Sequence, residues 1–128
     1  MHWDMHVGGV VLLSLRVDPE FFEWLRPRVT DSEIVQFDPY RDSVLDLLAQ
    51  ERWLTALSQA CEALRGEART LTQQTHRLPS DPQARESIVT NLVDRALSQH
   101  PWRGLLTELI ASLQLSRESH GTIRVLGD

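Results

Sequence analysis

The chain has 128 residues, of which 41% are hydrophobic and 24% charged, and its formal net charge is −5. These values exclude a disordered chain, and we expect residues 1–128 to form a single domain. The single cysteine, Cys61, excludes an intramolecular disulfide; together with the lack of a signal peptide or a membrane-spanning apolar run, it predicts a cytoplasmic protein with no membrane partner.

The first apolar segment, residues 7–17, is rich in β-branched residues and predicts a strand. Gly8 and Gly9 indicate a bend or bulge within it. The uninterrupted apolar run at residues 10–13 is typical of a strand that is covered on both faces or packed under helices. Asp18 and Pro19 then predict the start of a short helix that Pro27 ends, because aspartate caps helices and proline suits their first position.

The middle of the chain contains one ambiguous segment and one clear helix. Residues 33–37 could form a short second strand. Asp38 and Pro39 repeat the helix-start signal and predict a helix whose apolar face includes residues 44–48. From Arg52, apolar residues recur at steps of three and four, and Cys61 lies on this stripe as a small buried residue. This pattern predicts a long amphipathic helix that ends near Thr75.

Two further helices and a strand complete the pattern. Asp81 and Pro82 start a helix with an apolar stripe at residues 88–97, and Pro101 opens another with a stripe at residues 105–115. Gly121 is placed to cap that helix, and residues 122–126 alternate as a closing strand. The expected fold is α+β: a small sheet pairs the N- and C-terminal strands and packs against four to five helices.

The search for catalytic or cofactor-binding residues finds no motif. His2 and His6 have a ligand spacing but no further ligand near them, and the other histidines fall at predicted helix ends. All 13 basic residues are arginine, so lysine chemistry is excluded. A negative chain without a basic run does not suit nucleic acid. We therefore expect no catalytic residues, no metal, no cofactor and no enzymatic activity.

Charge is distributed unevenly along the chain. Residues 18–51 contain nine acids and three arginines, whereas residues 52–128 contain eight acids and nine arginines. Aromatic residues are interleaved with the acids of the first segment. Acidic residues beside aromatic ones suit a surface that receives a basic protein, because charge steers the encounter and a ring anchors it. The candidate partner-binding residues are Asp31, Glu33, Asp38, Tyr40, Asp42 and Asp46.

The order of these segments resembles a family of small bacterial immunity proteins from polymorphic-toxin systems. The matching pieces are a valine-glycine strand at Val7-Gly8, a proline followed by paired phenylalanines at residues 19–22, the helix over residues 57–64, and the closing helix and strand at residues 105–126. The resemblance implies that the chain neutralises a cognate toxin by binding it in the cytosol. Toxin nucleases are commonly basic, which fits an acidic docking face.

Two other hypotheses remain open. The chain could be an adaptor or structural subunit of a larger bacterial assembly, such as a defence or secretion complex, held by a partly exposed apolar stripe at residues 105–115. It could also be a small enzyme that uses scattered carboxylates and histidines such as His6, His76 and His120. A homodimer, formed through an edge strand or a helix face, is compatible with each of them.

Overall fold

The computed structural model describes residues 1–127. In chain order, the elements are β1 (His2–Val7), β2 (Val10–Arg16), α1 (Glu20–Leu25), the 3₁₀ helix η1 (Arg26–Arg28), α2 (Ser32–Val35), β3 (Ser43–Leu45), α3 (Leu47–Thr75), α4 (Pro82–Ser98), α5 (Arg103–Glu118) and β4 (Thr122–Leu126). The fold is α+β, as the sequence predicts.

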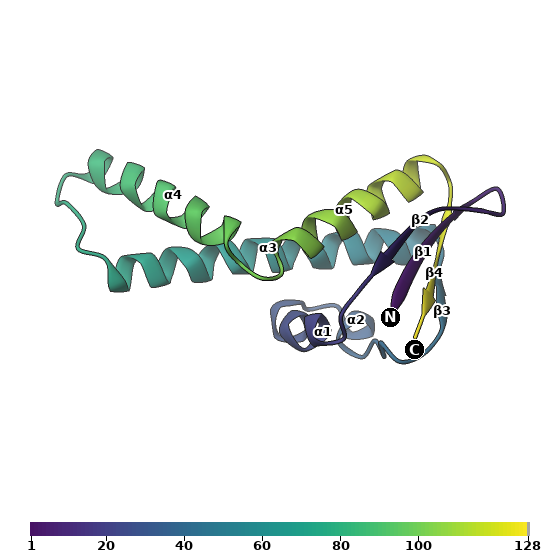
Figure 1. Ribbon diagram of the computed structural model, residues 1–128. Coiled ribbons are helices and arrows are strands. Elements are labelled where there is room, and N and C mark those ends of the chain that lie inside the picture. The colour runs from purple at the N-terminus through teal and green to yellow at the C-terminus, as the bar shows by residue number, and fades with distance from the viewer. Residues whose placement is uncertain (128) are drawn as a thin grey trace.

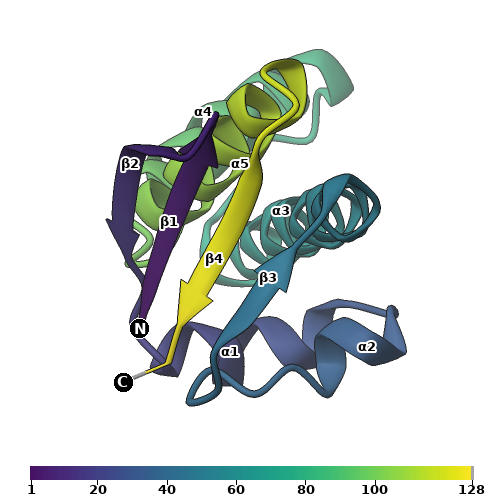
Figure 2. The same cartoon turned by 90° about the vertical axis from the view of Figure 1, so that its right-hand side faces the viewer.

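One antiparallel sheet has the strand order β2-β1-β4-β3 (Figure 2). The N-terminal strand β1 and the C-terminal strand β4 lie side by side at its centre, with Trp3 opposite Val125 and Met5 opposite Ile123. This confirms the expected pairing of the chain ends. It also makes β2 and β3 the two edges of the sheet.

The helices form an extended layer beside the sheet (Figure 1). Helix α3 has 29 residues and is therefore about 43 Å long. Its N-terminal half lies against α5 and the sheet, and its C-terminal half forms a hairpin with α4 that projects away from the sheet. The short helices α1 and α2 lie near the end of the sheet where both chain termini are found.

The core lies between the sheet, α1, α3 and α5. Strand residues Trp3, Ile123 and Val125 bury their side chains in it because alternate strand residues point to the same face. Phe22 of α1 and Trp53 of α3 meet them there, and the rings of Trp3 and Trp53 contact edge to face with centroids 5.1 Å apart. This aromatic cluster joins the sheet to both helices.

The predicted strand at residues 7–17 is instead the end of β1, a tight turn and β2, and β1 begins earlier, at His2. Gly8 and Gly9 have φ of +59° and +80°, which a two-residue hairpin of the primed type requires and which glycine adopts without strain. The turn pairs Val7 with Val10 and returns the chain alongside β1. The expectation that residues 10–13 are covered on both faces is therefore wrong: β2 is an edge strand, and all four of these residues are exposed.

The segment between residues 32 and 48 also differs from the prediction. Residues 32–35 form α2, not a strand, because Asp31 caps this turn by accepting a hydrogen bond from the backbone N–H of Glu33. Residues 43–45 form β3 beside β4, not a helix. The cap that starts α3 is Asp46, which accepts from the N–H of Ala49 at 2.8 Å. The pairing with β4 thus overrides the local helix signal at Asp38 and Pro39.

Two further expectations need correction. Cys61 is half-buried at the side of α3 rather than fully buried. At the end of α5 the left-handed residue is His120, with φ of 52°, and not Gly121. Gly121 is needed for another reason, since a Cβ there would lie 2.6 Å from the carbonyl oxygen of His6. The absence of a side chain lets β4 begin directly beside β1.

Candidate protein-binding surface

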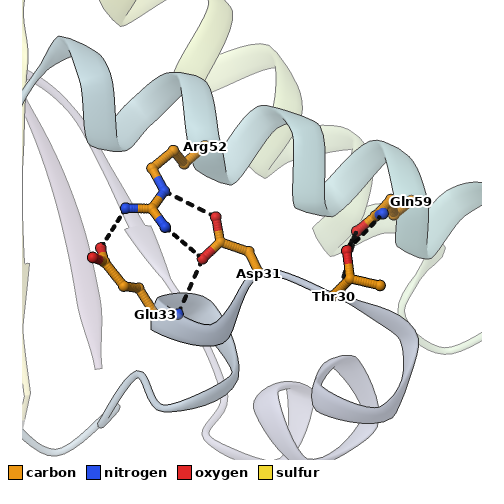
Figure 3. A network of polar contacts seen from close by, with 5 residues as sticks. All are labelled: Thr30, Asp31, Glu33, Arg52 and Gln59. Carbon is orange, nitrogen blue, oxygen red and sulfur yellow. Dashed lines mark hydrogen bonds and ion pairs between the residues drawn. The ribbon is translucent and has the colours of Figure 1, made fainter.

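Asp31 and Glu33 share one arginine of α3 (Figure 3). The Arg52 guanidinium donates from Nε and Nη2 to the two Asp31 oxygens, each at 2.9 Å, and its Nη1 lies 2.6 Å from Glu33 Oε2. The hydrogen bonds from Arg52 lower the pKa of Asp31, and those to Asp31 and then Glu33 raise the pKa of Arg52. This network fastens α2 to α3, so these two acids have a structural role.

Thr30, one residue before this network, makes a second polar contact with α3 (Figure 3). Its backbone N–H donates to Gln59 Oε1 at 3.3 Å, and Gln59 Nε2 donates to Thr30 Oγ1 at 3.1 Å. Arg52 and Gln59 are seven residues apart, which places them on the same side of a helix. The segment that leads into α2 is therefore held along two turns of α3.

The loop between α2 and β3 presents Tyr40 to solvent. Asp38 Oδ1 accepts a hydrogen bond from the Tyr40 N–H at 2.9 Å, and Asp42 Oδ1 accepts one from the Gly127 N–H at 2.9 Å. These two bonds fix the backbone on both sides of Tyr40, whose side chain is 65% exposed. Arg41 Nε lies 3.9 Å from Asp38 Oδ2, and the Arg41 side chain is 84% exposed, so this ion pair is weak.

The six candidate residues thus fall into three local arrangements rather than one cluster. Asp31 and Glu33 belong to the Arg52 network, Asp38, Tyr40 and Asp42 to one loop, and Asp46 to the cap of α3. Asp42 and Asp46 bracket the three-residue strand β3. The loop at residues 38–42 is the arrangement in which carboxylates lie beside an exposed aromatic ring.

The sequence prediction misses a second exposed feature. Along the β2 edge, the side chains of residues 10–13 are 58%, 49%, 57% and 41% exposed. The sequence signal that could have revealed it is the Gly8-Gly9 pair between the alternating segment at residues 2–7 and the apolar run at residues 10–13, which is typical of a hairpin. A hairpin pairs each of its strands on one side only, so either strand is an edge until another strand pairs with it.

A groove of about 690 Å³ lies where α3, α4 and α5 meet. Its apolar lining includes Leu64, Val93 and Leu106, and its polar lining includes Cys61 and Arg103. Burial raises the pKa of the Cys61 thiol, although Arg103 and Arg65 oppose this shift. A raised pKa disfavours the thiolate, which is the nucleophilic form of cysteine.

The remaining titratable residues include ion pairs such as that between Arg69 and Glu86, and Glu51, Arg117, Glu118 and His120 line one shallow pocket. Residues 1–127 bring together no group of three histidine, cysteine or acidic side chains that could hold a metal ion. Burial, and then Arg28, lowers the pKa of His100. Of the helices in these residues, none combines the length and apolar character that a membrane crossing requires.

The fold and its surface define an α+β protein with an acidic, aromatic loop at one side of the sheet and an apolar strand at the other. Comparisons with protein-family models, with curated proteins and with solved structures found no match to this chain. Function must therefore be inferred from the chemistry of these surfaces.

Proposed function

We propose that the protein is a non-enzymatic protein-binding domain of the immunity type, which neutralises a basic cognate toxin in the bacterial cytoplasm through the loop at residues 38–42. The observation that carries this proposal is the exposed ring of Tyr40, on a backbone that hydrogen bonds to Asp38 and Asp42 hold in place. An exposed tyrosine on a fixed backbone loses little conformational freedom when it is buried by a partner. Tyrosine is also enriched among residues that dominate binding energy.

Electrostatics supports a basic partner. The nine acids and three arginines of residues 18–51 sum to a charge of −6 (3 − 9), and two of these arginines are directed into the fold. Arg26 donates to the carbonyl oxygens of Val35 and Phe37, and Arg28 donates to that of Trp24. Arg52, which pairs with Asp31 and Glu33, reduces the sum for this region to −5 (4 − 9). The exposed Arg41 lies in the loop itself. The remaining negative charge speeds association with a positive protein.

The test is binding to a basic protein encoded beside the gene for this chain. Tyr40→Ala should weaken binding by about 30-fold or more if the ring is an anchor. Asp38→Lys with Asp42→Lys should slow association, and more so at low salt. The matched control, Glu62→Lys with Glu108→Lys, makes the same charge change on α3 and α5 and should bind as the wild type does. Equal binding by all these variants would contradict the proposal.

The adaptor hypothesis is the second candidate, but most of its predicted stripe is buried or half-buried. Leu106, Leu109 and Leu113, the centre of the stripe at residues 105–115, are buried against the core. Only Leu115 of that stripe is largely exposed, at 47%. The apolar surface that favours an assembly role is instead the β2 edge.

A further inference from the structure

We infer that the β2 edge is a self-association surface, on which β2 of a second copy of this chain pairs antiparallel to give an eight-stranded sheet. This inference is independent of the proposed function, because β2 and the loop beside β3 lie at opposite edges of the sheet. The first supporting feature is the open backbone edge. β2 has seven residues and, within residues 1–127, pairs on one side only, with β1. Its other side therefore presents unpaired N–H and C=O groups.

The two edges of the sheet are built differently. β3 has three residues and is bracketed by the carboxylates of Asp42 and Asp46. Short length and flanking charge are common protections against pairing with another chain. β2 is more than twice as long and has no charged or proline residue between Val10 and Leu15. The β3 edge is thus the better protected of the two, since β2 has a bulge at Leu12 but neither a charge nor a proline before Leu15.

The bulge in β2 leaves a regular stretch for pairing. The register shifts between Met5 and His6, so Leu12 is the extra residue on β2. Beyond it, residues 13–16 pair in regular register with residues 5–2 of β1. Leu12 itself is 57% exposed, and its side chain adds apolar area at the point where a second strand would approach.

Charge favours a second copy in the antiparallel direction. The only charged residue of β2 is Arg16 at its end. A parallel copy would place two Arg16 side chains side by side, whereas an antiparallel copy separates them by roughly 14 Å if Ser14, within the regular stretch, lies on the two-fold axis. The acid-rich segment is placed mainly toward the β3 side, so pairing through β2 also keeps the two acidic loops at the far ends of the joined sheet.

A two-fold antiparallel pair makes a geometric prediction. One residue on the symmetry axis must lie opposite its own copy, and strand residues directly opposite each other have Cβ atoms about 4.5–5.5 Å apart. A cysteine at that position can form a disulfide with itself across the interface. In a Cys61→Ala background, single cysteines at positions 10 to 14 should therefore give one position of maximal cross-linking.

The experiment combines mass measurement with this scan. Light scattering and sedimentation should show a 14.7 kDa species at low concentration and a shift toward twice that mass between about 1 and 500 µM, since one strand edge makes a smaller interface than the usual 1,600 Å² or so. Leu12→Lys should abolish the shift. Leu71→Lys changes a similarly exposed leucine of α3 (60%). This control variant should still show the shift in mass.

The inference is overturned by a constant monomer mass over this range, or by a dimer that Leu12→Lys leaves unchanged. Circular dichroism shows whether Leu12→Lys retains the wild-type fold; if it does not, the cysteine scan decides. If none of the single-cysteine variants forms a cross-link, that result counts against pairing. A second protein captured on β2 by a chain that stays monomeric would also overturn self-association, while leaving the loop proposal to its own test.

Discussion

Arg52 of α3 donates two parallel hydrogen bonds to the carboxylate of Asp31, 21 residues earlier in the chain, each at 2.9 Å. Asp31 also caps α2. One side chain thus begins a helix and fastens it to the longest helix of the fold. Acidic residues in this segment stabilise the structure as well as give it charge, and experiments must separate the two roles.

Stability should depend on the charge of Asp31. Its pKa is lowered from 3.8 by the Arg52 hydrogen bonds, so the folded state binds this proton less readily than the unfolded chain does. The resulting stabilisation is present above the unfolded value and is lost as the pH falls through the lower folded pKa. Asp31→Asn should therefore flatten the dependence of unfolding free energy on pH in the acid range, measured by urea denaturation.

A double-mutant cycle provides the control for that measurement. Arg52→Gln should reduce the acid dependence in a similar way, and the Asp31→Asn, Arg52→Gln double variant should lose little more than either single variant, because both changes remove the same pair. An Asp31→Asn protein with the wild-type pH profile would show that the pair does not act on stability.

Gln50 should contribute strongly to stability, although it is polar. Its side chain is fully buried, and its amide nitrogen donates to the carbonyl oxygens of Leu45 at 2.9 Å and Gly121 at 3.0 Å. These bonds join α3 to the end of β3 and the start of β4. Gln50→Leu leaves two carbonyls without this donor and should lower the unfolding free energy by about 1–3 kcal/mol.

Gln73→Leu is the matched control for Gln50. Gln73 lies on the same helix, but it is exposed. Its replacement should change stability by less than about 0.5 kcal/mol. Equal effects of the two substitutions in chemical denaturation would mean that the two buried hydrogen bonds contribute little.

Two glycines should respond to alanine in opposite directions. Gly66 lies in the interior of α3, where a Cβ would meet open space, so Gly66→Ala should stabilise the protein by about 0.5–1 kcal/mol. Gly121→Ala brings a Cβ within 2.6 Å of the His6 carbonyl oxygen and should destabilise it. Thermal unfolding of both variants measures the contrast, and a stabilised Gly121→Ala protein would contradict the close approach of β4 to β1.

Cys61 should react slowly with thiol reagents. Burial raises its pKa, so less thiolate is present near neutral pH than for an exposed cysteine, and the half-buried position limits access. A comparison protein carries Cys61→Ala and Ser87→Cys, with the new thiol on the exposed face of α4. It should react at least about tenfold faster. If the wild type and the comparison protein react at equal rates, the groove does not protect the Cys61 thiol from reagents.

Several elements follow from local patterns in the chain. The amphipathic stripes of α3, α4 and α5, the Asp81 cap and the alternation in residues 122–126 each specify an element through neighbours within a few residues. The pairing of an N-terminal strand with the C-terminal strand is also predictable, because apolar strands need a common sheet. The strand that pairs with β4 is residues 2–7, however, and not the predicted apolar run, which forms β2. The uneven charge is equally a property of the chain alone.

Long-range contacts determine the remainder. Residues 43–45 extend because β4 offers hydrogen bonds to them, and Asp31 and Glu33 turn toward Arg52 because α3 passes beside α2. The exposure of residues 10–13 depends on whether another strand lies beside β2. The sequence does not reveal this, because an apolar run has the same composition in a covered strand and in an exposed one. Local pattern specifies the type of an element, whereas its partners, and hence its surface, depend on residues far away in the chain.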